Sequence, residues 1–351
     1  MRIGINLLYL IPGKVGGTET YARELIPVMA ETDQLVIYCD RSTALTFKPT
    51  KNVKIIALPF NSSNRLARIF LEQTLLPILC LVHQVDVQFS LGYSAPFIHF
   101  CPSVVTIHDL NWYFHPEDFN RINRYVWEWM TRLSARFSTH VITDSQSSAD
   151  SLYQVLKIPK VKITPILHAT PSKVKTKQYP IQKPYLFTVM ANYPHKNLAS
   201  LLKAFDQLAK KFPDLTLVVC GLGKQSYSTS RVKYLGYVSR EELAFLYTNA
   251  SIFVFPSAYE GFGYPVLEAM SYGAPVISSN ATSLSEVVGE GGILVDPYDI
   301  KGYVKAITEV FQSSKLRNDL ILRGKKRSSE LKWEYTSSKS LSVLRRACKY
   351  E

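Results

Sequence analysis

The chain has 351 residues, of which 46% are hydrophobic and 20% charged. This is the composition of a globular protein with a sizeable core, and it excludes a disordered chain; the length favours two domains. Lysine and arginine number 41 against 28 acids, a net charge of +13 that favours an anionic partner. No signature of a nucleic-acid-binding module is present, so nucleic acid is not the expected partner, and only the net charge keeps a nucleic-acid-binding protein as an alternative.

The five cysteines are scattered, and no pair has the spacing of a metal site or a redox motif. This pattern is typical of a reducing compartment and predicts a cytoplasmic protein. The start of the chain mimics a short signal peptide but has no small-residue cleavage site, so a buried strand is expected there. The most apolar stretch, residues 69–83, is too short to span a membrane and contains Glu72.

Short apolar runs alternate with helical stretches in the first half. Strands are predicted at residues 2–10, 34–40, 53–59, 85–91, 103–109 and 139–145. The first helix is predicted at residues 18–31, with Thr18 as its N-cap. Continuous apolar strands separated by helices predict a parallel sheet that is covered on both faces.

A segment rich in proline and lysine, residues 168–184, has the composition of a linker. The alternation then restarts, with strands expected at residues 185–192, 215–221, 232–238, 251–257, 274–279 and 292–297. The fold class is therefore α/β, with two Rossmann-like, doubly wound parallel-sheet domains at 1–170 and 171–330. The tail at 331–351 is expected to form a helix that crosses back onto the first domain. Loops at the carboxyl ends of both sheets would face a central cleft.

The stretch "SAYEGFGYPVLEAMSYGAPVIS" places Glu260 and Glu268 on either side of a glycine turn. Gly261 and Gly263 allow tight turning, and Pro265 suits the first turn of a short helix. The start of a helix attracts phosphate, and carboxylates accept hydrogen bonds from sugar hydroxyls. A sugar nucleotide carries both groups. The alternative is an ordinary glycine-rich turn in which Glu268 is a surface acid.

Continued through "SNATSLSEVVGEGGILVDP", this stretch closely resembles the signature of glycosyltransferase family 4, two glutamates separated by seven residues. Five further stretches agree with the family in their order along the chain: "GGTETYARELI", "VVTIHDLNWYFHPEDF", "HVITDSQSSADSL", "YPHKNLASLLKAF" and "YLGYVSREELAFLYTNASIFVFPS". The resemblance implies a retaining hexosyltransferase of the GT-B fold. Its donor would be a nucleotide-sugar, UDP-glucose first and GDP-mannose second, and its acceptor a glycan or lipid-linked glycan in polysaccharide biosynthesis.

The resemblance also implies roles for single residues. Glu260 would position sugar hydroxyls and stabilise charge at the anomeric carbon, Glu268 would hold the ribose, and Lys196 would neutralise the leaving diphosphate. His108 would lie near the donor sugar, although a lone histidine is more often structural, and Asp109 would cap the loop or orient the site. The other expected donor-binding residues are Gly16, Gly17, His195, Tyr237, Val238, Gly261, Phe262, Gly263, Tyr264, Pro265 and Val266.

The chain departs from the family pattern near Lys196. Many relatives carry an arginine just after the preceding strand or just before the lysine, where this chain has residues 190–192 and His195. His195 is mostly neutral near pH 7 and would substitute only partly. No Asp-x-Asp triplet occurs, so neither a metal nor a cofactor is expected. The missing arginine keeps open a catalytically silent nucleotide-sugar-binding protein.

Basic and aromatic residues alternate in "RINRYVWEWMTRLSARF", residues 121–137. A helix of this composition suits contact with an anionic membrane surface, here the inner face of the membrane. The alternative is an amphipathic helix with a solvated basic face.

Overall fold

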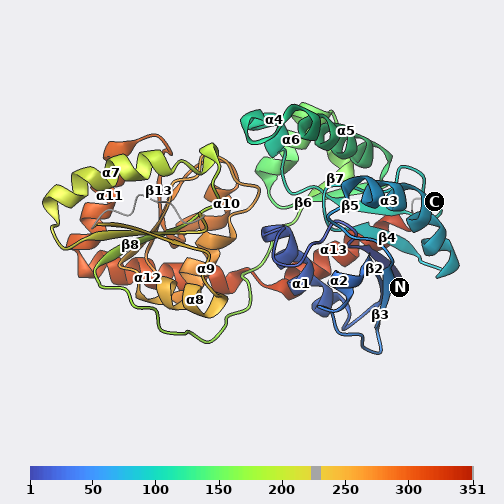
Figure 1. The fold of residues 1–351 in the computed structure, drawn as a ribbon, viewed down its shortest axis with the longest axis horizontal. Coiled ribbons are helices and arrows are strands. Elements are labelled where there is room, and N and C mark those ends of the chain that lie inside the picture. Colours follow the sequence, from blue (N-terminus) through green and yellow to red (C-terminus); the bar gives the residue numbers. More distant parts are fainter. Residues whose placement is uncertain (223–230, 350–351) are drawn as a thin grey trace. The chain divides into compact units, whose positions relative to one another are not determined.

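The computed structural model describes residues 1–222 and 231–349 and divides the chain into two compact units. Unit 1 comprises Met1–His168 and the segment from Lys332 onward, and unit 2 comprises Ala169–Leu331. The divisions fall within two residues of the boundaries expected at 170 and 330. Each unit is built on a parallel sheet with helices between its strands, so the prediction of two Rossmann-like α/β domains is confirmed (Figure 1).

The described part of unit 1 forms a seven-stranded parallel sheet in the order β3-β2-β1-β4-β5-β6-β7. Its strands are β1 (Arg2–Asn6), β2 (Gln34–Asp40), β3 (Val53–Leu58), β4 (Val87–Ser90), β5 (Ser103–Thr106), β6 (His140–Thr143) and β7 (Ile163–Pro165). Its helices are α1 (Gly17–Met29), α2 (Arg41–Ala44), α3 (Arg65–Val82), α4 (Asn111–Phe114), α5 (Arg121–Phe137), α6 (Gln146–Leu156) and α13 (Trp333–Ala347), with short 3₁₀ turns η1 (Pro116–Asp118) and η2 (Lys160–Lys162).

The two-residue period of β5 separates the two faces of this sheet. Val105 and Ile107 enter a hydrophobic cluster that includes Ala135 from α5. Thr106, between them, faces the opposite side, where its hydroxyl lies 3.5 Å from the Tyr21 hydroxyl of α1. The strand thus packs Val105 and Ile107 on the side of α5 and directs the Thr106 hydroxyl toward α1.

Helix α13 packs against α1 although it follows unit 2 in the sequence. Its first residue, Trp333, lies 6.2 Å from the Tyr21 ring, and the Thr336 hydroxyl donates a hydrogen bond to the Leu167 carbonyl 2.9 Å away. Near its other end, Arg345 lies 3.0 Å from the buried Asp33 carboxylate. The C-terminal helix is therefore part of the wall of unit 1.

In unit 2 the described residues form a six-stranded parallel sheet in the order β10-β9-β8-β11-β12-β13. Its strands are β8 (Tyr185–Val189), β9 (Thr216–Cys220), β10 (Val232–Gly236), β11 (Ile252–Phe255), β12 (Val276–Ser279) and β13 (Ile293–Val295). Its helices are α7 (Leu198–Lys211), α8 (Arg240–Asn249), α9 (Tyr264–Tyr272), α10 (Leu284–Val288), α11 (Ile300–Gln312) and α12 (Ser314–Glu330), with 3₁₀ turns η3 (Pro194–Lys196) and η4 (Gly289–Gly291).

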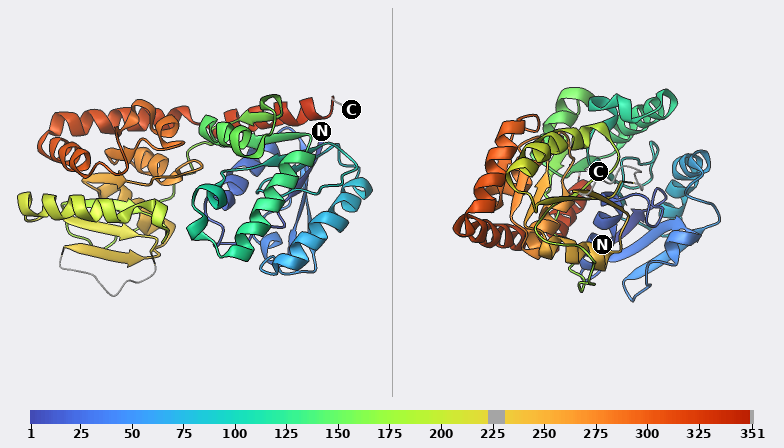
Figure 2. Two further views of the ribbon diagram at one scale, coloured as in Figure 1. Left: turned by 90° about the horizontal axis from the view of Figure 1, so that it is seen from above. Right: turned by 60° about the vertical axis from the view of Figure 1, so that its left-hand side comes forward.

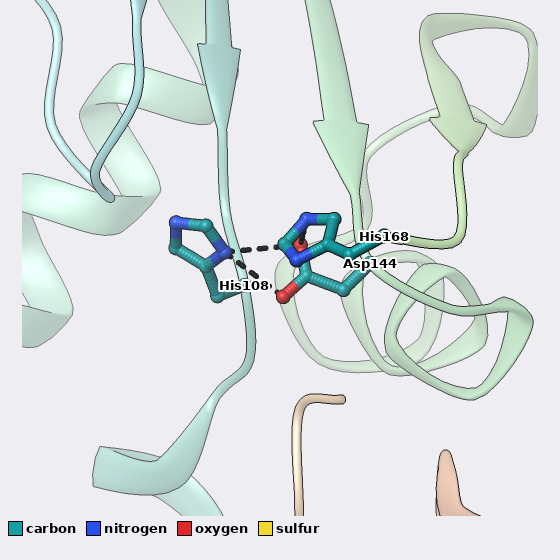
Figure 3. Close-up of side chains that lie close together, drawn as sticks. All are labelled: His108, Asp144 and His168. Atoms are coloured by element: carbon teal, nitrogen blue, oxygen red, sulfur yellow. Dashed lines mark hydrogen bonds and ion pairs between the residues drawn. The ribbon is translucent and has the colours of Figure 1, made fainter. Parts of the chain in front are cut away.

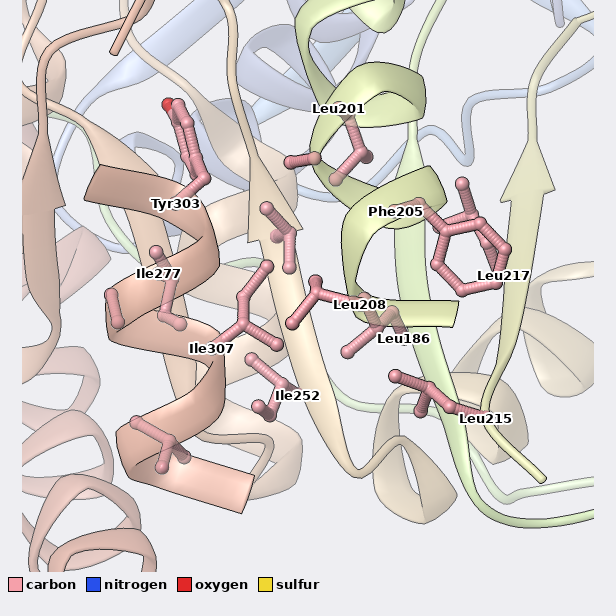
Figure 4. Packing of buried hydrophobic residues seen from close by; sticks show 14 of the residues in the cluster. Leu186, Leu201, Phe205, Leu208, Leu215, Leu217, Ile252, Ile277, Tyr303 and Ile307 are labelled. Atoms are coloured by element: carbon pink, nitrogen blue, oxygen red, sulfur yellow. The ribbon is translucent and has the colours of Figure 1, made fainter. Parts of the chain in front are cut away.

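One hydrophobic cluster joins α7 and α11 to the sheet of unit 2 (Figure 4). Leu201, Phe205 and Leu208 project from α7 at helical spacing and meet strand residues such as Leu217 and Ile252. Burying a large aliphatic or aromatic side chain stabilises a fold by about 1.5–3 kcal/mol. This core fixes the carboxyl ends of β8 and β11, which carry the candidate site.

The start of α1 differs from the sequence prediction by one residue. The predicted N-cap at Thr18 is wrong: α1 begins at Gly17, and Gly16 occupies the cap position with a φ of 59°. The Thr18 hydroxyl instead donates to the Val15 carbonyl. Helix α8 begins with a full capping box between Ser239 and Glu242.

Helices lie on both sides of the sheet in each unit (Figure 2), as expected for a doubly wound topology. Within the described ranges, no helix has both the length and the apolar character needed to cross a membrane.

Candidate functional site

Lys196 ends a short turn at the carboxyl end of β8. Asn197, the next residue, adopts the left-handed conformation with a φ of 57°. Its side-chain amide donates hydrogen bonds to the carbonyls of Pro256 and Pro297. The turn is therefore tied to the loops that follow β11 and β13, which holds the Lys196 side chain at this edge of the sheet.

Glu260 lies in the loop between β11 and α9, and both of its backbone polar groups are hydrogen-bonded. Its N–H donates to the Thr282 hydroxyl at 3.0 Å, and its carbonyl accepts from the Ser283 hydroxyl at 2.9 Å. The same loop is joined to the lysine turn, because the Ala258 N–H donates to the His195 carbonyl at 2.8 Å. These bonds fix the position of the loop through its backbone groups alone, so the Glu260 carboxylate oxygens are left for other partners.

The structure brings Lys196 and Glu260 together. The ammonium nitrogen Nζ lies 2.8 Å from Oε1 of the carboxylate, and the two side chains are only 17% and 12% exposed. Sequence analysis assigned the two residues to one site but did not predict that they form an ion pair. A cation held beside a carboxylate at the end of a strand can be taken over by an incoming phosphate, because both anions compete for the same charge.

Gly263 stands at the start of α9 with a φ of 106°, a conformation that side chains rarely adopt. A Cβ there would lie 2.6 Å from a methyl carbon of Leu284. The glycine lets the backbone turn directly into a helix whose first turn contains Pro265. The start of α9 lies directly after this turn, and the positive end of its helix dipole favours an anion such as phosphate.

Glu268 lies one turn into α9 and accepts a hydrogen bond from the Tyr247 hydroxyl of α8 at 2.9 Å. Tyr247 is buried, and burial raises the pKa of its phenol well above the ordinary value of 10. The phenol therefore stays protonated and donates at neutral pH. Sequence analysis missed Tyr247, because its distance from Glu268 depends on the packing of two helices.

The other predicted donor-binding residues of unit 2 lie on loops after strands. Tyr237 follows β10 and is 85% exposed. His195 is buried, and its ring stacks on Tyr193 with centroids 5.5 Å apart. Burial leaves little of the His195 ring for a ligand, so its expected role in replacing the missing arginine finds no support in this geometry. Val238 lies in the loop after β10. The remaining residues lie in the loop before α9, which contains Gly261, Phe262 and Gly263, and in its first turn, which contains Tyr264, Pro265 and Val266.

In unit 1, Gly16 and Gly17 are exposed at the start of α1, after the loop that follows β1. His108 follows β5 and is only 5% exposed. Because Thr106 pairs with Ile142 in the sheet, the same register places His108 beside Asp144, two residues further along each chain segment.

His108, Asp144 and His168 form a buried cluster at this edge (Figure 3). Nδ1 of His108 lies 3.0 and 2.9 Å from the two carboxylate oxygens of Asp144, and Nε2 lies 2.9 Å from the Leu91 carbonyl. Nε2 of His168 lies 2.9 Å from the same carboxylate. Sequence analysis named only His108; the strand ends "TIHD" and "VITD" carry the signal that would have added Asp144.

The charges of the cluster follow from its contacts. Burial alone would raise the pKa of Asp144, but the two histidines lower it to about 2. Burial alone would lower the pKa of His108, but the Asp144 carboxylate raises it above the ordinary 6.5. Burial lowers the pKa of His168. These pKa shifts favour an ionised Asp144, a protonated His108 and a neutral His168.

Aromatic rings and a second acid surround these three side chains. The Tyr21 ring stacks on His168 with centroids 4.2 Å apart, and Tyr93 meets the edge of His108 at 5.2 Å. Asp109 accepts a hydrogen bond from the Asn111 N–H at 3.0 Å, so it caps the loop, one of the two roles expected for it. Burial raises the pKa of Asp109.

The predicted site residues thus fall into two groups, each at the carboxyl edge of its own sheet. Family models match both halves: one described as "Glycosyltransferase Family 4" matches residues 15–170, and one described as "Glycosyl transferases group 1" matches residues 172–327.

The chain belongs to glycosyltransferase family 4.

Curated relatives of this family-4 chain include the O-antigen chain mannosyltransferase B of Escherichia coli, 36% identical over 43% of this chain and 42% of the relative. The O-antigen chain mannosyltransferase RfbU of Salmonella typhimurium is 30% identical over 59% of this chain and 60% of the relative. The chain thus spans about half the length of the curated relatives it matches. Among solved structures, a sucrose-phosphate synthase from Thermosynechococcus elongatus superposes with a TM-score of 0.79 at 18% identity, covering 100% of both chains. This likeness supports the GT-B fold.

Proposed function

We propose that this family-4 protein is a retaining glycosyltransferase that moves a hexose from a nucleotide-sugar to a glycan or lipid-linked glycan acceptor in polysaccharide biosynthesis. The observation that carries the proposal is the ion pair of Lys196 and Glu260, 2.8 Å apart beside the start of α9. A movable cation, a fixed carboxylate and the positive end of a helix dipole at one edge are what a sugar diphosphate requires.

In the proposed reaction the donor diphosphate takes over the Lys196 ammonium from Glu260. The lysine then neutralises charge on the leaving diphosphate, while the freed Glu260 carboxylate faces the sugar and stabilises positive charge at the anomeric carbon. Glu268, oriented by Tyr247, accepts from the ribose hydroxyls. The acceptor hydroxyl attacks from the side that the leaving group departs from, and the departing diphosphate takes its proton. The sequence shows no obvious nucleophile for a double displacement.

The relatives change the order of the expected donors. UDP-glucose was the first expectation from the sequence, with GDP-mannose second. The two relatives described above are both named mannosyltransferases, which supports mannose as the transferred sugar. GDP-mannose therefore becomes the first donor of the proposal, and UDP-glucose the second.

A panel of GDP- and UDP-sugars with mass-spectrometric detection tests the donor. Slow hydrolysis of one donor by the isolated protein, accelerated by a glycan acceptor, supports the proposal. Acceptor-dependent turnover with an inverted anomeric configuration would contradict the retaining assignment.

A catalytically silent nucleotide-sugar-binding protein is the second candidate. Two observations favour it: the strand before Lys196 ends without the arginine common in relatives, and His195 is buried. Such a protein would bind GDP-mannose or UDP-glucose in a thermal-shift assay without hydrolysing or transferring the sugar. Turnover of either donor removes this candidate.

We place the enzyme in the cytoplasm, at an anionic inner membrane face. Ile122, Tyr125 and Trp129 lie on one face of α5 and are 77%, 60% and 60% exposed. Exposed apolar rings on a helix that also carries four arginines suit an interfacial position. This placement fits a lipid-linked acceptor.

A further inference from the structure

We infer that Asp144 and His168 are positioning residues that hold His108 as a permanent imidazolium, so that His108 serves the site as a fixed cation and not as a proton acceptor. The inference concerns the His108–Asp144–His168 cluster of unit 1. Its consequences for catalysis rest on the proposed function, whereas the protonation state of His108 does not.

Both ring nitrogens of His108 face groups that accept hydrogen bonds. Nε2 lies 2.9 Å from the Leu91 carbonyl, which can only accept a hydrogen bond. Nδ1 lies 2.9 and 3.0 Å from the oxygens of the Asp144 carboxylate, which also only accepts while it is ionised. Both nitrogens must therefore carry protons, and the ring has no lone pair with which to take a proton from an acceptor hydroxyl.

His168 completes the arrangement from the other side of the carboxylate. Its Nε2 lies 2.9 Å from Oδ1 of Asp144, and its ring is held by the parallel stack with Tyr21 at 4.2 Å. With its Nε2 at this distance, a neutral His168 restricts rotation of the carboxylate and leaves the negative charge of Asp144 to His108. His168 follows β7, and its ring stacks on Tyr21 of α1, so the ring is held from the strand side and from α1.

The titratable groups that face His108 determine its charge together. Asp144 follows β6, Asp109 is the next residue in the chain, and His168 follows β7. Tyr21 approaches from α1 with its ring centroid 5.4 Å away, and Tyr93 from the loop after β4 at 5.2 Å. Both acids favour the charged ring, and only His168, which stays neutral, would oppose it.

The same three side chains are the described group whose donor atoms lie close enough to hold a metal ion. The contacts favour a hydrogen-bonded ion pair instead. Nδ1 of His108 is almost equally distant from both carboxylate oxygens at hydrogen-bond length, which leaves no place for an ion between ring and acid. Zinc bound stoichiometrically to the purified protein, and lost in the Asp144→Asn variant, would overturn the inference.

Nitrogen NMR of the full chain tests the protonation state directly. With ¹⁵N-labelled histidine, both ring nitrogens of His108 are expected to show imidazolium shifts at pH 7.5, with the signal assigned by its loss in His108→Gln. Asp144→Asn keeps the shape of the side chain, and its amide can donate to Nδ1, so His108 should become neutral in this variant. A neutral His108 ring in the wild type at pH 7.5 would overturn the inference whether or not the protein transfers sugar.

Kinetics test the positioning role. Asp144→Asn is expected to lower kcat by roughly tenfold or more, since a fixed charge at the site is lost. Activity of this variant should rise as the pH falls below 7, because protonation of His108 restores the cation; the wild type should show no such rise. The matched control is His140→Gln, which changes another buried histidine, on β6, outside the cluster. Wild-type kcat and pH profile in Asp144→Asn would show that the cluster only supports the fold.

Two variants of His168 test the positioning role even if Asp144→Asn does not fold. His168→Gln keeps a donor toward Asp144, whereas His168→Phe keeps the ring stack with Tyr21 and loses the donor. We expect near wild-type kcat for His168→Gln and a lowered kcat with an altered pH profile for His168→Phe. Equal kcat and equal pH profiles in the two variants would contradict the role given to His168.

Discussion

At the scale of single residues, the site of unit 2 depends on one ion pair. Lys196 and Glu260 are 64 positions apart in the sequence, yet their side chains meet at 2.8 Å because the Asn197 amide and the His195 carbonyl tie the two loops together. Each charge of the pair satisfies the other. The proposed donor therefore has to replace one partner of this pair, which makes both residues sensitive to substitution.

Glu260→Gln is expected to keep much of the donor affinity and to lower kcat by roughly tenfold to a thousandfold, because the amide cannot stabilise developing positive charge. Steady-state kinetics at saturating donor measure this, with Glu290→Gln, an exposed acid on η4, as the control. A turnover near that of the wild type would refute the role of Glu260.

Lys196→Ala is expected to weaken donor binding more than Lys196→Arg, and to weaken GDP or UDP binding more than nucleoside binding. The loss should be about 2–4 kcal/mol, the range for removing one member of a poorly solvated charge pair. Calorimetry with nucleotide and nucleoside measures it, and Lys203→Ala, an exposed lysine on α7, is the control. Equal losses for diphosphate and nucleoside would mean that Lys196 supports the fold and does not contact phosphate.

At the scale of elements, the sequence predicted most strands and helices, because buried parallel strands are continuous apolar runs. It also placed Glu260 in a loop and Glu268 in a helix, since the glycines and Pro265 mark that turn. It did not predict the contacts of Tyr247 with Glu268 or of His168 with Asp144. Those contacts join elements distant in the sequence, and only packing brings them to hydrogen-bond distance.

Helix α5 supplies the prediction at this scale. Trp129→Ser is expected to reduce cosedimentation with vesicles containing anionic lipid by several-fold, because an exposed indole at an interface buries apolar area in the lipid. Tyr335→Ser, which changes an exposed aromatic residue on α13, is the control and should leave binding unchanged. Wild-type cosedimentation of Trp129→Ser, or equal binding of wild type to neutral vesicles, would remove the membrane-surface proposal.

At the scale of the whole molecule, the chain passes between its two units twice, after His168 and after Leu331. Hydrogen bonds join the two passages within each unit. In unit 1 the Thr336 hydroxyl donates to the Leu167 carbonyl, and in unit 2 the Thr170 N–H donates to the Leu331 carbonyl. The length and the restarted alternation of strands and helices indicated two domains, and a C-terminal helix that returns to the first domain was also predicted. It could not show that the returning helix packs on α1, close to the His168 ring.

The proposed transferase activity is expected to survive chelation. The Lys196 ammonium and the start of α9 can neutralise a diphosphate without a divalent ion, and no Asp-x-Asp triplet is present to hold one. Initial rates with and without excess EDTA measure this after dialysis. Loss of turnover in EDTA that a divalent ion restores would show that the metal-free proposal is wrong.

The most direct test of the central claim is transfer of mannose from GDP-mannose, measured with the anomeric configuration of the product determined by NMR. The account predicts acceptor-dependent release of GDP, a product with the α configuration of the donor, and a strongly reduced rate in Glu260→Gln with intact donor binding. Binding of the donor by the wild type without release of GDP, for GDP-mannose and for UDP-glucose alike, would contradict the claim that this family-4 protein is a glycosyltransferase.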